Sequence, residues 1–150
     1  MRTLQTKELR SAYRVRAALE GLTAELVAER QQAGEIAPAA FAELDRLAAK
    51  ADEATRAKDL TAGAGHNRAF HLKLADLADN DPARDALTRI WDQIVVSTKR
   101  SLVAPKRAKA VDEEHRRLLE AIRAGDVEKA AETARAHVLN TLEEFDVAHA

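Results

Sequence analysis

The stretch EHRRLLEAIRAGD, residues 114–126, decides the fold that this sequence predicts. Leu118 and Ile122 recur in it at helical spacing and predict the apolar face of a helix. Gly125 is suited to end that helix, and the side chain of Asp126 is suited to cap the next one. A helix, a tight turn and a second helix within so few residues indicate two neighbouring antiparallel helices.

Outward from this stretch, the same signals predict six helices and no strands. Alanine and unbranched side chains dominate the composition, and these residues lose little rotamer freedom in a helix. The predicted helices span residues 7–32, 38–58, 60–78, 82–104, 108–124 and 127–147. Because the connections between them are short, we expect an all-α, antiparallel bundle of about six helices.

Apolar residues at helical spacing predict which faces of these helices are buried. In the first helix they are Val15, Leu19, Leu22 and Leu26. In the second helix they are Phe41, Leu44, Leu47 and Ala51. In the fourth they are Leu87, Ile90, Trp91, Ile94 and Val95, and in the sixth Val138, Leu142 and Phe145. Asp81 is the expected N-cap of the fourth helix, because Pro82 suits a first helical turn.

The composition excludes several classes of protein. A length of 150 residues suits one domain. A net charge of -1, with acids and bases interspersed, offers no basic face for the phosphates of nucleic acid. The absence of cysteine rules out disulfides and thiolate metal sites, so nitrogen and oxygen must hold any metal. No apolar run approaches the ~20 residues that cross a bilayer, so we expect a soluble cytoplasmic protein with no membrane partner.

Four polar residues lie on or beside the apolar faces of three predicted helices: Asn67, His71, His115 and His137. Asn67 and His71 are four residues apart and therefore share one face. If the helices bring all four together, three imidazoles and an amide oxygen form a divalent-metal site with open positions for water or substrate. Such a donor set suits Zn, Ni, Mn or Fe.

Each of these residues also has a plainer interpretation. A single histidine on an apolar helical face is more often a hydrogen-bonded core residue than a metal ligand. Asn67 alone fits a surface position or the start of a helix. The spacing does not decide between the two interpretations, because three separate helices have no fixed sequence distance between them.

A second polar row, formed by Arg16, Glu20 and Thr23, runs along the first predicted helix. An arginine in such a row can clamp a carboxylate bidentately within a pocket. From the spacing alone, an ordinary Arg–Glu pair on the surface is the favoured interpretation.

Four blocks of the sequence resemble the C-terminal effector domain of GntR-family transcription regulators, of the FCD type. The blocks are residues 13–20, 67–71, 114–126 and 134–137, and their order and spacing agree over nearly the whole chain. The block at 114–126 is the most specific, followed by Asn-x-x-Phe-His at 67–71. Among FadR-like and VanR-like domains, six helices rather than seven resemble the shorter, VanR-like branch.

The resemblance implies an effector-binding and dimerisation domain over residues 13–148, with a central ligand or metal cavity and with residues 1–12 as a linker or the leading part of the first helix. It implies a divalent metal (Zn, Ni or Mn) whose ligands are Asn67, His71, His115 and His137. It also implies that Arg16 and Glu20 contact a small organic acid. The expected partners are this acid and a second copy of the chain in a homodimer. Such a domain senses a ligand and is not an enzyme.

Two features depart from the family pattern. Asn67 stands where an aspartate is frequent, and a neutral amide contributes less charge to a metal site, although its oxygen still ligates. The family's N-terminal winged helix-turn-helix is missing, since about a dozen residues precede Tyr13. DNA binding is therefore expected only through that missing domain. We favour an excised effector domain over a natural product without a DNA-binding domain.

Two other functions stay open at this stage. A three-histidine site with open positions can activate water in a metalloenzyme. However, the sequence contains neither His-Glu-x-x-His nor Glu-x-x-His, the spacings that place a base or further ligands on one helical face. The other alternative is a non-catalytic interaction bundle in which the histidines are structural.

Overall fold

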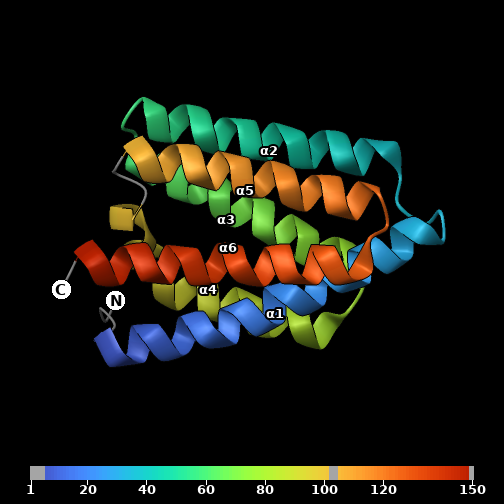
Figure 1. Cartoon of the computed structure of the whole chain (residues 1–150), viewed down its shortest axis with the longest axis horizontal. Coiled ribbons are helices and arrows are strands. Elements are labelled where there is room, and N and C mark those ends of the chain that lie inside the picture. Colours follow the sequence, from blue (N-terminus) through green and yellow to red (C-terminus); the bar gives the residue numbers. More distant parts are fainter. Residues whose placement is uncertain (1–5, 102–104, 149–150) are drawn as a thin grey trace.

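The computed structural model describes the backbone of residues 6–101 and 105–148 and the side chains of residues 7–94 and 107–144. Over these residues the chain forms six α-helices and no strand. They are α1 (Thr6–Gln32), α2 (Pro38–Arg56), α3 (Leu60–Leu77), α4 (Asp81–Ser101), α5 (Pro105–Arg123) and α6 (Val127–Ala148). Successive helices alternate in direction, so the predicted all-α antiparallel bundle is confirmed (Figure 1).

Helix α1 is the most widely connected element of the bundle. It packs along α6 and also contacts α3, α4 and α5. On the other side of the molecule α2 lies beside α3 and α5 (Figure 1). The helices α3, α5 and α6, which carry the candidate histidines, are therefore all in contact with α1.

The predicted turn at the end of α5 is confirmed. Gly125 has a φ of 67°, in the left-handed region that suits glycine. The carboxylate of Asp126 then accepts a hydrogen bond from the backbone N–H of Lys129 at 3.2 Å, which caps α6. Gly34, with a φ of 72°, follows α1 in the same way.

Two predicted helix starts are wrong, by one and by three residues. Asn80, not Asp81, caps α4, because its side-chain oxygen accepts a hydrogen bond from the N–H of Ala83 at 3.0 Å. Asp81 instead lies in the first turn of α4. Helix α5 begins at Pro105 rather than Ala108, since proline is well tolerated at a first helical position, where its missing N–H is not needed.

The buried face of α1 differs from the predicted one. Val15 and Leu22 are 50% and 37% exposed, and Leu19 and Leu26 are only partly buried. The polar row is buried instead: Arg16 is 1% exposed, Glu20 4% and Thr23 2%. The predicted surface Arg–Glu pair is therefore wrong. Two opposite charges that neutralise each other, flanked by small alanines on the same side of the helix, allow this face to pack inside.

The other predicted apolar faces are confirmed wherever the side chains are described. The buried residues among them are Phe41, Leu44, Leu47, Ala51, Leu87, Trp91, Ile94, Val138 and Leu142, and Ile90 is partly buried. Val95 and Phe145 lie outside the residues whose side chains are described. Within the described ranges, none of the helices combines the length and the apolar character that spanning a membrane requires.

Candidate metal centre

The structure brings the three predicted histidines together from three helices. His71 comes from α3, His115 from α5 and His137 from α6, and one ring nitrogen of each lies within 4.8 Å of the others. Their ring centroids are 4.9 to 5.2 Å apart. All three rings are buried, with at most 2% of each residue exposed. Three nitrogens gathered in this way could hold one metal ion.

Asn67 lies one helical turn before His71 on α3 and is 6% exposed. Its side-chain oxygen is buried and has no hydrogen-bond partner among the described residues. A buried amide oxygen without a partner is unusual, and it is available to a cation or a water. Whether Asn67 ligates a metal stays a prediction.

Glu20 connects the histidine group to Arg16. One oxygen of its carboxylate contacts Nδ1 of His71, and the other accepts from Nε of Arg16. Because Nδ1 of His71 faces a carboxylate, Nε2 is the nitrogen that remains for a metal, and it has no hydrogen-bond partner among the described residues. A carboxylate behind a metal-binding imidazole fixes the ring and raises its basicity.

A second set of the same kind lies behind His137. Its Nδ1 lies 2.7 Å from a carboxylate oxygen of Glu114. Arg107 donates two hydrogen bonds to that carboxylate, at 3.2 and 3.1 Å, and a further one to the hydroxyl of Thr141. Asn140 also donates to Glu114 at 3.0 Å. Two of the three histidines therefore each have a glutamate carboxylate at Nδ1, and each of these carboxylates is bound by an arginine.

Neither Glu114 nor Arg107 was predicted from the sequence to have a role in the centre. They are seven residues apart, two helical turns, so they share a face of α5. This spacing is the signal that could have identified them. It is a weak signal, because charged pairs at helical spacing are ordinary on solvent-exposed faces.

Burial lowers the pKa of each histidine in the centre. The pKa of His71 falls to about 4, although the carboxylate of Glu20 opposes the shift. The pKa of His115 falls well below its usual value through burial and the nearby rings, and the pKa of His137 is lowered by burial against the opposing effect of Glu114. All three imidazoles are thus neutral at pH 7, the form that binds metals.

The pKa values of the two glutamates are also lowered, but by neighbouring charges and in spite of burial. Burial alone would raise the pKa of Glu20, but Arg16 and His71 outweigh it and lower the pKa to about 2. Burial is also outweighed at Glu114, where His137 and Arg107 lower the pKa to about 2. Both carboxylates are ionised at neutral pH and can accept a hydrogen bond from an imidazole.

Aromatic rings enclose one side of the centre. Trp91 stacks on His71 with centroids 5.4 Å apart, and Cζ of Arg16 lies 3.9 Å from the centroid of the Trp91 ring. Phe70 stacks on His115 at 4.4 Å. Trp91 is the only tryptophan of the chain, so its fluorescence reports on the centre.

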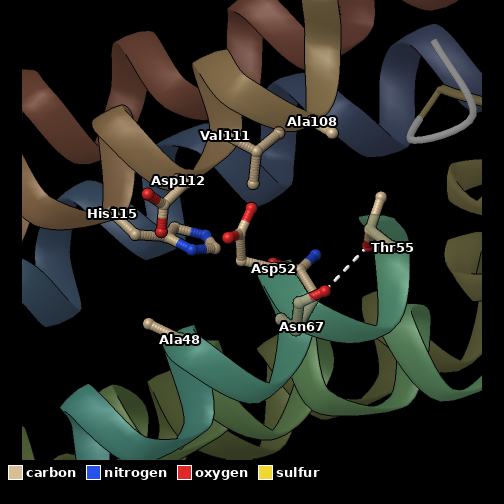
Figure 2. A pocket seen from close by; sticks show the side chains of 9 residues that line it. Ala48, Asp52, Thr55, Asn67, Ala108, Val111, Asp112 and His115 are labelled. Atoms are coloured by element: carbon tan, nitrogen blue, oxygen red, sulfur yellow. Dashed lines mark hydrogen bonds between the residues drawn. The ribbon is translucent and has the colours of Figure 1, made fainter. Parts of the chain in front are cut away.

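A narrow cleft lies between α2 and α5, with His115 of the centre in its wall (Figure 2). We call it the α2–α5 cleft. Its walls are Ala48, Ala51, Asp52, Thr55, Asn67, Ala108, Val111, Asp112 and His115. The glycine at position 63 lets α3 approach α2 closely beside it, because a Cβ there would lie 2.7 Å from the hydroxyl of Thr55. His115 is thus both part of the centre and part of the wall of the cleft, and Asn67 lies in the same wall.

The chain belongs to the FCD domain family, which matches residues 11–140. This confirms the resemblance to the effector domain of GntR-family regulators. Among solved structures, the chain is similar to E. coli McbR/YncC, a GntR-family regulator, with a TM-score of 0.80 and 20% sequence identity over 95% of this chain and 69% of that chain. At that identity the likeness shows the fold alone. No curated protein matches this sequence.

Proposed function

We propose that this effector-binding domain of the GntR family senses a small organic acid through a divalent metal held by the buried histidines. The observation that carries the proposal is the convergence of three buried, neutral imidazoles, with Nε2 of His71 and Nε2 of His115 lacking hydrogen-bond partners among the described residues. Buried polar atoms are nearly always satisfied, so such a group of unsatisfied donors and acceptors fits an ion.

The proposed ligands of the metal are His71, His115 and His137, with Asn67 as a fourth. Nitrogen and oxygen donors of this kind fit Zn, Ni or Mn. When bound, the metal supplies a positive charge and open positions that bind the carboxylate of the acid. Glu20 and Glu114 hold the rings of His71 and His137 in the orientation that exposes Nε2.

Arg16 is the proposed clamp for the carboxylate of the acid. Its Nε is bonded to Glu20, but its Nη1 is buried without a hydrogen-bond partner among the described residues. A guanidinium with one satisfied and one unsatisfied edge suits an incoming carboxylate. Glu20 was also predicted to contact the acid, and we propose that it does so while it positions Arg16.

Binding of the acid would join α1, through Arg16, to the three helices that carry the histidines. A ligand that favours one packing of these helices shifts the population toward that packing. In a full-length, cytoplasmic regulator this shift would change how two N-terminal DNA-binding domains are placed. Exposed Val15 and Leu22 on α1 and exposed Leu139 on α6, two helices that pack together, are the proposed contact with a second copy.

We favour binding over catalysis because the carboxylates that reach the histidines already have partners. Glu20 is held by Arg16, and Glu114 is held by Arg107 and Asn140. A general base must be free to take a proton. A purely structural role for the histidines leaves the unsatisfied nitrogens of His71 and His115 without an explanation.

Calorimetry on the metal-loaded and on the chelated protein tests the proposal. We expect one equivalent of Zn²⁺ or Ni²⁺ per chain, and heat from an acid such as citrate or lactate only in the loaded protein. His71→Ala should lower the metal affinity by more than about 100-fold and abolish the thermal shift on adding metal, because a ligand and its share of the binding energy are lost. Well under one equivalent of metal, or acid binding that survives chelation, would refute the metal-bridged sensor.

A further inference from the structure

Two carboxylates lie at the α2–α5 cleft, one on each helix. Asp52 belongs to α2 and Asp112 to α5, and both line the cleft (Figure 2). They are close enough to interact: after partial burial, the charge of Asp52 is the main reason that the pKa of Asp112 is raised. Two like charges facing each other across a helix contact destabilise the fold unless a cation compensates them.

The arginines nearby compensate this charge only in part. Arg56 bonds to Asp52, at 2.9 and 3.0 Å, and Arg116 lies 3.5 Å from Asp112, each on the same helix as its carboxylate. The side chains of Arg56 and Arg116 are 57% and 65% exposed. Such exposed pairs are weak and exchange readily with solvent ions, so the two carboxylates remain accessible to a cation.

The same two helices are joined differently away from the cleft. There Arg123 of α5 donates to Asp45 of α2 at 2.5 Å, an ordinary cross-helix ion pair. At the cleft an acid of one helix faces an acid of the other. Arg56 of α2 also attracts Asp112 of α5, but its effect on the pKa of Asp112 is smaller than that of Asp52. The acids at the cleft are therefore not arranged chiefly to hold α2 to α5.

Deeper in the cleft are the two atoms best suited to receive a cation. The side-chain oxygen of Asn67 and Nε2 of His115 are buried, and neither has a hydrogen-bond partner among the described residues. Both side chains line the cleft, whose walls are otherwise made largely of small residues such as Ala48 and Ala108. The donors therefore differ in burial: the two carboxylates are partly exposed, and the amide oxygen and the imidazole nitrogen belong to buried residues.

We propose that the α2–α5 cleft is the entry route of the divalent metal, and that Asp52 and Asp112 form an outer cation site which captures the hydrated ion before Asn67 and His115 receive it. Hard carboxylate oxygens suit a cation that still holds its water, and imidazoles suit one that has lost it. The inference rests on the proposed metal centre. The same negative charge disfavours entry of an anionic acid, so the acid must reach Arg16 by another path.

The experiment measures how fast Co²⁺ alone enters the chelated protein, by stopped-flow quenching of Trp91 fluorescence. The test variant is Asp52→Asn/Asp112→Asn. The matched control is Asp45→Asn together with Glu43→Gln, which removes the same charge from α2 outside the cleft. We expect the association rate constant of the test variant to fall about tenfold at low ionic strength, as loss of electrostatic steering predicts, and that of the control to stay at the wild-type value.

The dissociation rate gives the decisive second readout. If the acids act only on entry and exit, dissociation slows by the same factor and the equilibrium affinity is unchanged. Added salt should slow uptake by the wild-type chain and have less effect on the test variant. An association rate equal to that of the wild type, or a weaker affinity that comes entirely from faster dissociation, would overturn the entry route.

The outcomes separate this inference from the proposed function. If the wild type binds Co²⁺ and His71→Ala does not, but the test variant loads at the wild-type rate, only the entry route is wrong. If wild type and His71→Ala bind Co²⁺ equally poorly, the metal centre itself fails and the entry route fails with it. Circular dichroism of each chelated variant checks that the bundle is intact, and the loss of a repulsion should leave the test variant folded.

Discussion

The two histidine–glutamate–arginine sets of the centre share one design and differ in what they leave free. In the first, Glu20 joins Arg16 to His71, and both charged side chains are buried, with Nη1 of Arg16 unsatisfied among the described residues. In the second, Glu114 has 13% of its side chain exposed, and Asn140 also bonds to it. Arg107 also keeps one unsatisfied nitrogen, Nε, but both of its terminal nitrogens are bonded to Glu114 or Thr141. The first set therefore has a terminal donor to offer a ligand, and the second mainly supports its histidine.

The largest expected difference between the sets is in stability. Glu20→Gln leaves Arg16 as an uncompensated buried charge and should destabilise the metal-free fold by about 3 kcal/mol. Glu114→Gln should cost roughly half as much, because Arg107 keeps its bond to Thr141 and the site is closer to solvent. Urea denaturation of the chelated variants measures both. Equal losses would show that the two sets do not differ in burial as described.

The same two variants should affect metal binding alike. Each removes the charged acceptor behind one imidazole, so each should weaken the affinity by about 10- to 100-fold. Competition with a chromophoric chelator measures it. An effect in only one variant would mean that one of the two histidines does not bind the metal.

Replacing each arginine in turn should separate binding of the acid from positioning of the histidines. Arg16→Ala should lower the affinity of the metal-loaded protein for the acid about tenfold or more and leave one equivalent of metal bound, since a charged hydrogen bond is worth about 1.5–3 kcal/mol. Arg107→Ala is the matched control and should leave acid affinity nearly unchanged. Calorimetry with citrate or lactate gives both values. If the two variants behave alike, Arg16 is not the clamp.

Acid should weaken the metal-free fold in two stages. The pKa of His71 in the folded chain, about 4, lies below its usual 6.5, so its contribution to stability is complete above about pH 6.5 and is lost as the pH falls toward 4. The pKa of Glu20 is lowered from 4.5 to about 2, so its contribution is lost only below about pH 4.5. Denaturation midpoints of the chelated protein across this range measure the loss.

A matched pair of variants assigns the first stage. His71→Gln should reduce the slope of the stability curve between about pH 6.5 and pH 4, because one of the three buried histidines whose pKa is lowered is gone, while His115 and His137 remain. His66→Gln changes a histidine on the same helix, outside the histidine group, and is the matched control. A curve that is unaffected by His71→Gln would show that His71 is not buried as a neutral ring.

The smallest expected effect is at Asn67. Asn67→Asp adds a charge at the same reach, so the metal should bind roughly tenfold tighter, about 1.4 kcal/mol. Metal competition at fixed pH measures it, and Gln93→Glu, at an exposed position of α4, is the charge-matched control. Unchanged affinity at Asn67→Asp would remove Asn67 from the set of ligands.

The fold was largely predictable because local signals agree with the final packing. The apolar faces of α2, α4 and α6 and the turn at Gly125 follow from spacing and from glycine's freedom at positive φ. The face of α1 was not predictable by the same rule. That rule predicts that Val15 and Leu22 are buried and that Arg16 is exposed. The burial of the neutralised Arg–Glu pair depends instead on how the neighbouring helices pack against α1.

The candidate site was predictable in part for related reasons. His71, His115 and His137 are unusual on apolar faces, so each could be singled out from its own helix. Glu114 and Arg107 could not, because charges on an amphipathic helix look the same whether they face water or an imidazole of α6. The α2–α5 cleft depends on how α2 and α5 are rotated, which no local pattern specifies.

The position of Arg16 along α1 gives the helix the geometry of a lever arm. Ten residues separate Thr6 from Arg16, which is about 15 Å of helix at a rise of about 1.5 Å per residue. A tilt of about 4° pivoting at Arg16 therefore moves the start of α1 by about 1 Å. A small movement of the Arg16 guanidinium would therefore produce a larger displacement at the N-terminal end of α1. That is the end which a preceding domain would adjoin.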